Sequence, residues 1–113
     1  MYKYACKVLR VVDGDTVVVQ VDLGFSVKVD IKFRLSSINT PELRGDQKEK
    51  GLAAKAEVER LLSLGQVTVQ SEKPVKADKY GRWLGTFFVQ QGDVSTNVNE
   101  TLIASGFAEL YKG

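Results

Sequence analysis

The order of patterned segments along this 113-residue chain predicts an α+β, mainly β fold: a five-stranded barrel with two or three helices. Three segments with strand signals come first, a helical segment follows, and two further strands and a second helix complete the order. A five-stranded barrel with a helix after its third strand is the plan of the OB-fold. A small α+β sandwich is the structural alternative. The length and the lack of repeats or linkers predict one domain over residues 1–113.

The first three strands are predicted from composition and from alternation. Residues 2–12 and 16–22 are rich in valine and aromatic residues, and Asp13-Gly14 between them favours a tight turn. Residues 25–35 alternate strictly between apolar and polar side chains, as a half-buried strand does. The predicted apolar face consists of Phe25, Val27, Val29, Ile31, Phe33 and Leu35. Arg34 is therefore expected on the polar face, at the end of an anchored strand.

A helix is predicted in the middle of the chain. Apolar residues fall at i, i+4, i+7 and i+8, namely Ala54, Val58, Leu61 and Leu62. Gly65 is well placed to end this helix. The charged loop over residues 44–50 before it is expected to be mobile. Strands are predicted to start at Val67 and to cover residues 83–89.

A second, shorter helix is predicted over residues 98–105. Asn97 or Ser95 can cap its start, and Gly106 can end it. The dipeptide Gly92-Asp93 predicts a turn between the preceding strand and this helix. The last quarter of the chain is therefore expected to read strand, turn and helix.

The composition excludes several kinds of catalytic and metal site. The chain has no histidine and one cysteine, which excludes a Ser-His-Asp triad, an HExxH zinc site and a disulfide within the chain. Cys6 lies in an apolar stretch and is predicted to be a small core residue. Proton transfer would fall to Asp, Glu, Lys or Tyr. A metal would take oxygen ligands, which favours Ca²⁺ or Mg²⁺ over zinc or copper.

The charge and hydropathy of the chain give only limited information about its partners. The net charge is +2 and the pI about 8.7, which alone is too weak to indicate nucleic acid. Lysines and arginine gather at residues 48–55 and 73–82, which ordinary solvated faces would also explain. No apolar run approaches the ~20 residues that span a bilayer, so no membrane partner is expected. No leader is visible, and cellular location stays open.

Three polar segments together carry the chemistry of a candidate site: Asp13-Gly14-Asp15-Thr16, Asn39-Thr40-Pro41-Glu42 and Asp78-Lys79-Tyr80-Gly81-Arg82. With Arg34 they offer hard oxygen ligands, a carboxylate able to act as a base, and two guanidiniums. Guanidiniums bind phosphate oxygens with two parallel donors. This set suits cleavage of a phosphate ester beside a divalent cation.

Each segment also has an ordinary structural explanation. Asp13-Gly14 is a common hairpin turn, and Pro41 can fix a turn or begin a helix that Thr40 caps. Gly81 can supply a turn with positive φ, and Arg82 can form a surface ion pair. No segment alone therefore identifies a function.

In this order and spacing, however, the segments resemble the staphylococcal nuclease family, also called thermonuclease. The resemblance runs from Val8 to about Ala108. The matching pieces are Val12-Asp13-Gly14-Asp15-Thr16, Phe33-Arg34-Leu35, Thr40-Pro41-Glu42, Asp78-Lys79-Tyr80-Gly81-Arg82, and Val98-Asn99-Glu100 with Leu102, Gly106 and Ala108. The resemblance implies an OB-fold barrel and a Ca²⁺-dependent nuclease that hydrolyses phosphodiester bonds of DNA and RNA, with single strands preferred. We expect a monomer.

The resemblance also implies roles for single residues in catalysis and substrate binding. Glu42 resembles the proposed general base for the attacking water. Arg34 and Arg82 resemble the pair that binds the phosphate and stabilises the charge that grows on it. Lys79 and Tyr80 resemble contacts to a neighbouring substrate phosphate.

The implied metal site departs from the family at one position. Asp15 resembles a carboxylate ligand, and Thr40 resembles the residue that offers its backbone carbonyl. Asn39 stands where the family has an aspartate ligand. An amide oxygen can coordinate Ca²⁺, but one negative charge is lost, and affinity falls with the charge of the ligands. We therefore expect weaker Ca²⁺ binding and an altered metal preference.

A second departure lies at the end of the sequence. The family's C-terminal helix has no counterpart before Gly113, and the tyrosine that stacks on a base in the family has no secure match. Tyr111 is near but out of step. The alternative function is a non-catalytic OB-fold nucleic-acid-binding module, and a protein-interaction domain is a third reading. Because the chain keeps Asp15, Arg34, Glu42 and Arg82, the sequence favours the enzyme.

Overall fold

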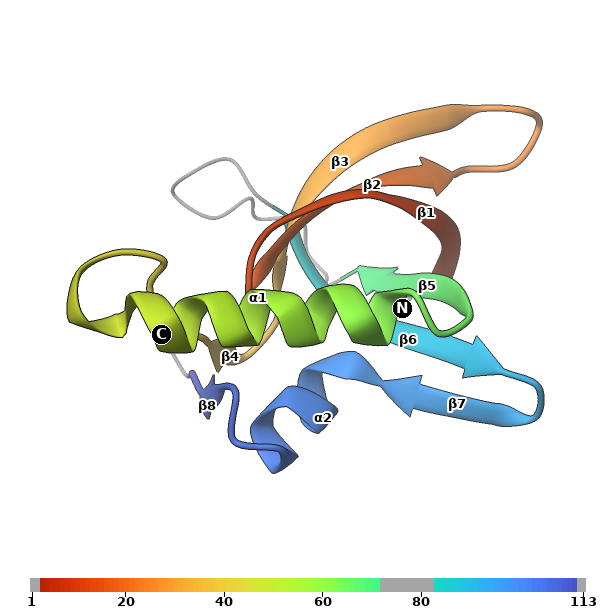
Figure 1. The fold of residues 1–113 in the computed structure, drawn as a ribbon. Coiled ribbons are helices and arrows are strands. Elements are labelled where there is room, and N and C mark those ends of the chain that lie inside the picture. Colours follow the sequence, from red (N-terminus) through yellow and green to blue (C-terminus); the bar gives the residue numbers. More distant parts are fainter. Residues whose placement is uncertain (1–2, 72–82, 112–113) are drawn as a thin grey trace.

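The computed structural model describes residues 3–71 and 83–111 of the chain (Figure 1). The elements are β1 (Lys3–Asp13), β2 (Thr16–Asp22), β3 (Lys28–Leu35), β4 (Ile38–Asn39), the 3₁₀ helix η1 (Gly45–Gln47), α1 (Lys48–Leu62), β5 (Gln66–Ser71), β6 (Trp83–Gln91), β7 (Val94–Asn97), α2 (Val98–Ala104) and β8 (Glu109–Leu110). No described helix is long and apolar enough to cross a bilayer.

Five strands close into a barrel, as the sequence predicts. The strand order is β3-β2-β1-β5-β6-β7, with antiparallel neighbours throughout. A parallel pairing of β3 with β6, from Phe33 opposite Trp83 to Leu35 opposite Gly85, joins the two ends of this order. The long strand β1 pairs with β2 along most of its length and with β5 near its start, and its register shifts twice. Such irregularities let a strand bend around a barrel.

The core lies inside the barrel and under the two helices. Strand β2 contributes Val17, Val19 and Val21, each at most 2% exposed, because successive side chains of a strand point to opposite faces. The rings of Phe33 and Phe87 meet edge to face at 5.7 Å between centroids. Full burial of such side chains contributes roughly 1.5–3 kcal/mol each. The barrel interior is therefore packed, and ligands must meet its rim or its outer face.

Helix α1 runs along one side of the barrel and α2 lies below it (Figure 1). The predicted apolar stripe of α1 is confirmed: its buried residues are Gly51, Ala54, Val58, Leu61 and Leu62. The predicted cap of α2 is also confirmed, since the Asn97 side chain accepts the Glu100 N–H at 3.0 Å. Gly106 follows this helix at a φ of 82°, a conformation that suits glycine.

The predicted third strand is too long at its start. Gly24, Phe25 and Ser26 have φ values of 84°, 53° and 63°, so they form the β2–β3 turn and not a strand. Phe25 is 100% exposed, and the apolar side chains of Val27 and Val29 are exposed as well. The reason is visible in Figure 1, where the tip of this hairpin extends beyond the barrel. Strict alternation predicts a strand, but it does not say how far the core reaches.

Three further features differ from the prediction. Residues 44–50, expected to be a loop, contain η1 and the first residues of α1. Strand β7 fills the space between the Gly92 turn and α2. The two-residue strands β4 and β8 pair with each other in a small second sheet, in which Asn39 lies opposite Glu109. Segments this short have too few residues for a period to be visible in the sequence.

Candidate functional site

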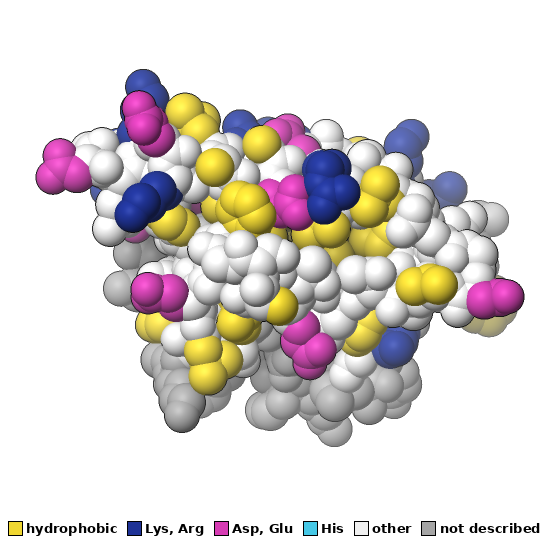
Figure 2. Space-filling view, turned by 60° about the horizontal axis from the view of Figure 1, so that its bottom comes forward, with side chains coloured by type: hydrophobic (Ala, Val, Ile, Leu, Met, Phe, Trp, Pro, Cys, Tyr) yellow, Lys and Arg dark blue, Asp and Glu magenta, His cyan; other side chains and the backbone are white. Residues whose placement is uncertain are grey.

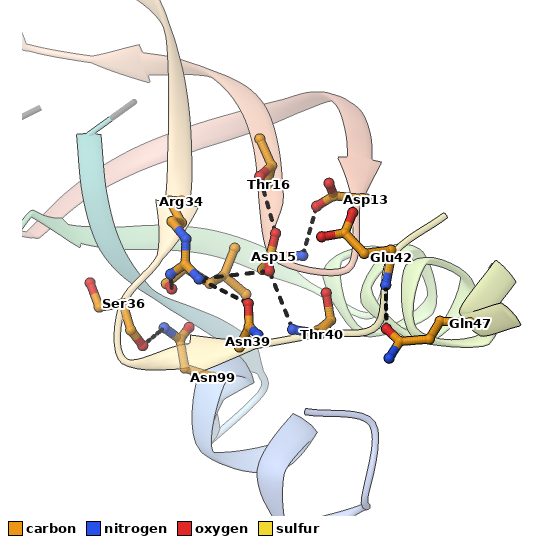
Figure 3. A network of polar contacts seen from close by, with 11 residues as sticks. Asp13, Asp15, Thr16, Arg34, Ser36, Asn39, Thr40, Glu42, Gln47 and Asn99 are labelled. Carbon is orange, nitrogen blue, oxygen red and sulfur yellow. Dashed lines mark hydrogen bonds and ion pairs between the residues drawn. The ribbon is translucent and has the colours of Figure 1, made fainter. Parts of the chain in front are cut away.

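The candidate site forms where the β1–β2 turn meets the end of β3 and the start of the segment after β4 (Figure 3). The register places Thr16 opposite Arg34, and the Leu35 N–H donates to the Asp15 carbonyl at 2.8 Å. Ser37 has a φ of 64° and turns the chain back after β3. That reversal brings Asn39 and the residues after it beside Asp15.

Asp15 is the centre of this site. Its side chain is only 11% exposed, although it carries a carboxylate. One carboxylate oxygen, Oδ1, accepts the Thr16 hydroxyl at 3.2 Å, and the other, Oδ2, accepts the Thr40 N–H at 3.3 Å. The Asp15 N–H in turn donates to Asp13 Oδ1 at 3.0 Å. Burial of a carboxylate is costly unless it is hydrogen-bonded, and here both oxygens are.

Arg34 lies against the same cluster. Its Nη2 donates to Asn39 Oδ1 at 3.2 Å and lies 3.9 Å from Asp15 Oδ2. Its Nη1 donates to the Leu35 carbonyl at 3.4 Å. The guanidinium carbon stands 4.8 Å from the centroid of the Tyr111 ring, a cation–π contact. As expected from the alternation of β3, the side chain leaves the polar face, and these contacts hold it in place.

Side-chain oxygens of this site lie around one positively charged group, the Arg34 guanidinium. The carboxylate of Asp15 and the amide of Asn39 come from separate segments, yet both face the same nitrogen of Arg34. Thr40, which is 9% exposed, adds a backbone carbonyl in the adjoining residue. These are hard oxygen donors, the type that Ca²⁺ takes. The donor set therefore fits Ca²⁺ in chemistry.

The number of charged donors is small. Among the described residues, no three His, Cys, Asp or Glu side chains group as a metal cluster. Ca²⁺ takes 6–8 oxygens, so the proposed ligands Asp15, Asn39 and Thr40 would leave several positions for water or substrate. The set contains a single carboxylate, and weaker Ca²⁺ binding stays a prediction.

Asp13 adds acidity beside the site. The pKa of Asp13 is raised from 3.8 to about 6. Burial is the largest cause, and the side-chain hydrogen bond with Asp15 and the charge of Asp15 add to it. The nearby negative charge of Asp15 disfavours the ionised form of Asp13. A divalent cation near the pair would relieve that repulsion. The sequence favoured a turn role for Asp13, and its hydrogen bond to the Asp15 N–H agrees with one.

Glu42 lies at the edge of the site, with an exposed side chain. Its N–H donates to Gln47 Oε1 at 3.2 Å, so η1 fixes its backbone. In Figure 3 its carboxylate points toward the turn that contains Asp13 and Asp15. The structure thus brings together Asp15, Arg34, Asn39, Thr40 and Glu42. Arg82, Lys79 and Tyr80 lie outside the described residues.

Two contacts in the site's surroundings were not predicted from the sequence, although the residues that make them were named there. Tyr111 is held next to Arg34 because its N–H donates to the Ser37 carbonyl at 2.8 Å, in continuation of the β4–β8 pairing. Asn99, which is 4% exposed, ties α2 to the chain just after β3 by donating to the Ser36 carbonyl at 3.1 Å. Neither long-range contact has a local pattern in the sequence that could have revealed it.

The surface charge gives little further guidance. On the face in Figure 2, basic, acidic and apolar side chains are interspersed among the described residues. This arrangement agrees with the small net charge of +2. Among the described residues on this face there is therefore no broad basic surface that could account for affinity for a polyanion.

Comparison with known proteins supports the resemblance noted in the sequence. The family model described as staphylococcal nuclease homologue matches residues 32–113. A protein of Methanocaldococcus jannaschii described as uncharacterized is 33% identical over 129 residues, which cover 96% of this chain and 59% of that protein. Protein ParB of Escherichia coli is 32% identical over 114 residues, which cover 94% of this chain and 56% of that protein. The chain thus spans little more than half the length of these relatives.

Proposed function

Because the chain belongs to the family of staphylococcal nuclease homologues, we propose that it hydrolyses phosphodiester bonds of DNA and RNA with the help of Ca²⁺. The observation that supports this most is the convergence of the Asp15 and Asn39 oxygens on the Arg34 guanidinium. Metal ligands and a phosphate-binding group are needed at one place, and these residues meet there. Single strands are the expected substrate because the family resemblance implies that preference.

In this proposal Arg34 binds the scissile phosphate. Its guanidinium turns from Asn39 toward two phosphate oxygens, while the buried stem keeps its place on β3. Arg82 supplies the second guanidinium. Donors aimed at growing negative charge act most strongly on the transition state, and loss of one costs roughly 3–4 kcal/mol. That loss corresponds to a rate decrease of about 10²- to 10³-fold.

Asp15, Asn39 and the Thr40 carbonyl would hold the cation in the proposed mechanism. When bound, Ca²⁺ supplies Lewis-acid polarisation of a phosphate oxygen. Glu42 acts on the attacking water, either by accepting its proton or by orienting it, and its exposed carboxylate is open to solvent for that purpose. Lys79 and Tyr80 contact a neighbouring phosphate.

The alternative is a non-catalytic module that binds nucleic acid. One observation favours it: Arg34 is engaged by both Asn39 and Tyr111, so its donors are partly used within the protein. A module of this kind would bind single strands through stacking and phosphate contacts and release them unchanged. Its binding would weaken steeply with added salt, as phosphate contacts do.

A Ca²⁺ titration separates the two functions. A fluorescently labelled single-stranded DNA is incubated with the protein at Ca²⁺ from micromolar to tens of millimolar, with EDTA as control, and binding of the same DNA is measured by anisotropy. Cleavage that requires Ca²⁺, with a midpoint in the high range, is the expected result. Salt-sensitive binding without cleavage at any Ca²⁺ concentration would instead assign the protein to the non-catalytic class.

A further inference from the structure

The backbone of Glu42 lies directly against helix α1 at Gly51. A Cβ at Gly51 would stand 2.1 Å from the Glu42 carbonyl oxygen, 2.7 Å from its carbon and 3.0 Å from the Pro41 oxygen. Real Cβ atoms essentially never come closer than 3.0 Å to such atoms. A side chain at this position would therefore displace the segment that carries Glu42.

The backbone conformation of Gly51 does not explain why a glycine is there. Its φ is not among the positive values, which occur at Gly24, Gly45, Gly92 and Gly106. Gly51 lies inside α1 and is buried. A glycine inside a helix costs about 1 kcal/mol relative to alanine. The close approach of the Glu42 backbone is the feature that accounts for it.

The same segment is confined on its other side by Gly14 in the β1–β2 turn. A Cβ at Gly14 would lie 2.7 Å from the Thr40 hydroxyl and 2.9 Å from Ala54 Cβ of α1. The chain from Thr40 to Glu42 thus passes between a turn and a helix, with a glycine facing it from each. Polar anchoring adds to this steric confinement, because Gln47 Oε1 accepts the Glu42 N–H at 3.2 Å.

We propose that Gly51 is a positioning residue, which sets the distance between the Glu42 carboxylate and the oxygen cluster around Asp15. It does so by allowing α1 to contact the Glu42 backbone, and Gln47 of η1 holds the same backbone by a hydrogen bond. This inference rests on the proposed nuclease function. Relief of the clash in Gly51→Ala requires a shift of about 1 Å, and a misplacement of that size can cost about 10²-fold in rate. Arg34 lies on β3, outside the displaced segment, and keeps its place.

The test compares kcat with DNA affinity in four proteins: wild type, Gly51→Ala, Glu42→Gln and the double variant. Gly51→Ala should lower kcat about 100-fold at saturating Ca²⁺, with an unchanged Kd for single-stranded DNA measured in EDTA. In the Glu42→Gln background the same change should cost nothing further, because the group that it displaces has already been removed. Ala53→Gly, at an exposed position of the same helix, is the matched control and should keep wild-type kcat.

The outcomes separate the inference from the function on which it rests. A wild type without cleavage at any Ca²⁺ concentration overturns both. An active wild type with an unaffected Gly51→Ala, or an equal loss in both backgrounds, overturns the positioning role alone. If Gly51→Ala does not fold, Gln47→Ala decides, since Gln47 is exposed. It should lower kcat about tenfold only when Glu42 is present, by loss of one hydrogen bond, and an unchanged kcat would contradict the proposal.

Discussion

Replacement of Asn99 by alanine should destabilise this fold strongly, because three buried hydrogen bonds are lost at once. The Asn99 side chain makes three buried hydrogen bonds: it accepts the Phe87 N–H at 3.1 Å and donates to the carbonyls of Ser36 at 3.1 Å and Gly85 at 3.2 Å. Each such bond contributes about 1 kcal/mol net, and each buried group left without a partner costs about 1–3 kcal/mol. Gly85 keeps a partner, the Ser36 N–H at 2.8 Å. The expected loss is about 3–4 kcal/mol.

Urea unfolding followed by the fluorescence of Trp83 measures this loss, because it is the chain's single tryptophan and is half-buried on β6. Asn97→Ala is the matched control. The hydrogen bond that truncation of the Asn97 side chain removes is the helix cap with the Glu100 N–H, so Asn97→Ala should cost about 1 kcal/mol. If Asn99→Ala were no more destabilising than Asn97→Ala, the three bonds would not be holding α2 to the barrel.

Three further predictions concern Cys6, Asp13 and Asn39. Burial raises the pKa of Cys6 from 9.0 to about 12, so at pH 8 the native thiol should react with a disulfide reagent about a thousandfold more slowly than in the unfolded chain; equal rates would refute this. The pKa of Asp13 is about 6 in the folded protein, against an ordinary value of 3.8. The contribution of Asp13 to stability is therefore full below pH 4 and is lost as the pH rises to 6. Asp13→Asn should stabilise the protein by about 1 kcal/mol at pH 7.5 and not at pH 3.5, as measured by thermal unfolding at both values. Asn39→Asp adds a negative charge among the proposed metal ligands and should lower the Ca²⁺ midpoint of cleavage. An unchanged midpoint would contradict the expected effect of the missing charge on Ca²⁺ affinity.

The sequence predicted the barrel because its long strands and α1 carry clear periods. The alternation of β3 placed Arg34 on the polar face at the end of a strand, as the structure has it, whereas the ion pair with Asp15 was not predicted from that pattern. The same alternation failed at Phe25, since a period records which side chains could share a face and not where packing ends. Pattern reasoning is reliable where many residues share one environment.

The details that arrange the site follow from contacts between distant segments. Tyr111 reaches Arg34 through a strand of two residues, and Asn99 fastens the chain after β3 from a helix more than 60 positions away. At Gly51, the lack of a side chain leaves the room that the Glu42 backbone needs to contact α1. None of these has a local signature, because each depends on which segments the closed barrel brings together.

The most direct test of the proposed mechanism is single-turnover cleavage of single-stranded DNA by Glu42→Gln at saturating Ca²⁺. Glu59→Gln, which removes the same charge from an exposed position on α1, is the control. The mechanism predicts that Glu42→Gln cleaves about 10²- to 10⁴-fold more slowly than wild type, the usual contribution of a general base, while Glu59→Gln keeps the wild-type rate. Cleavage by Glu42→Gln at the wild-type rate would contradict the assignment of the catalytic carboxylate to this site.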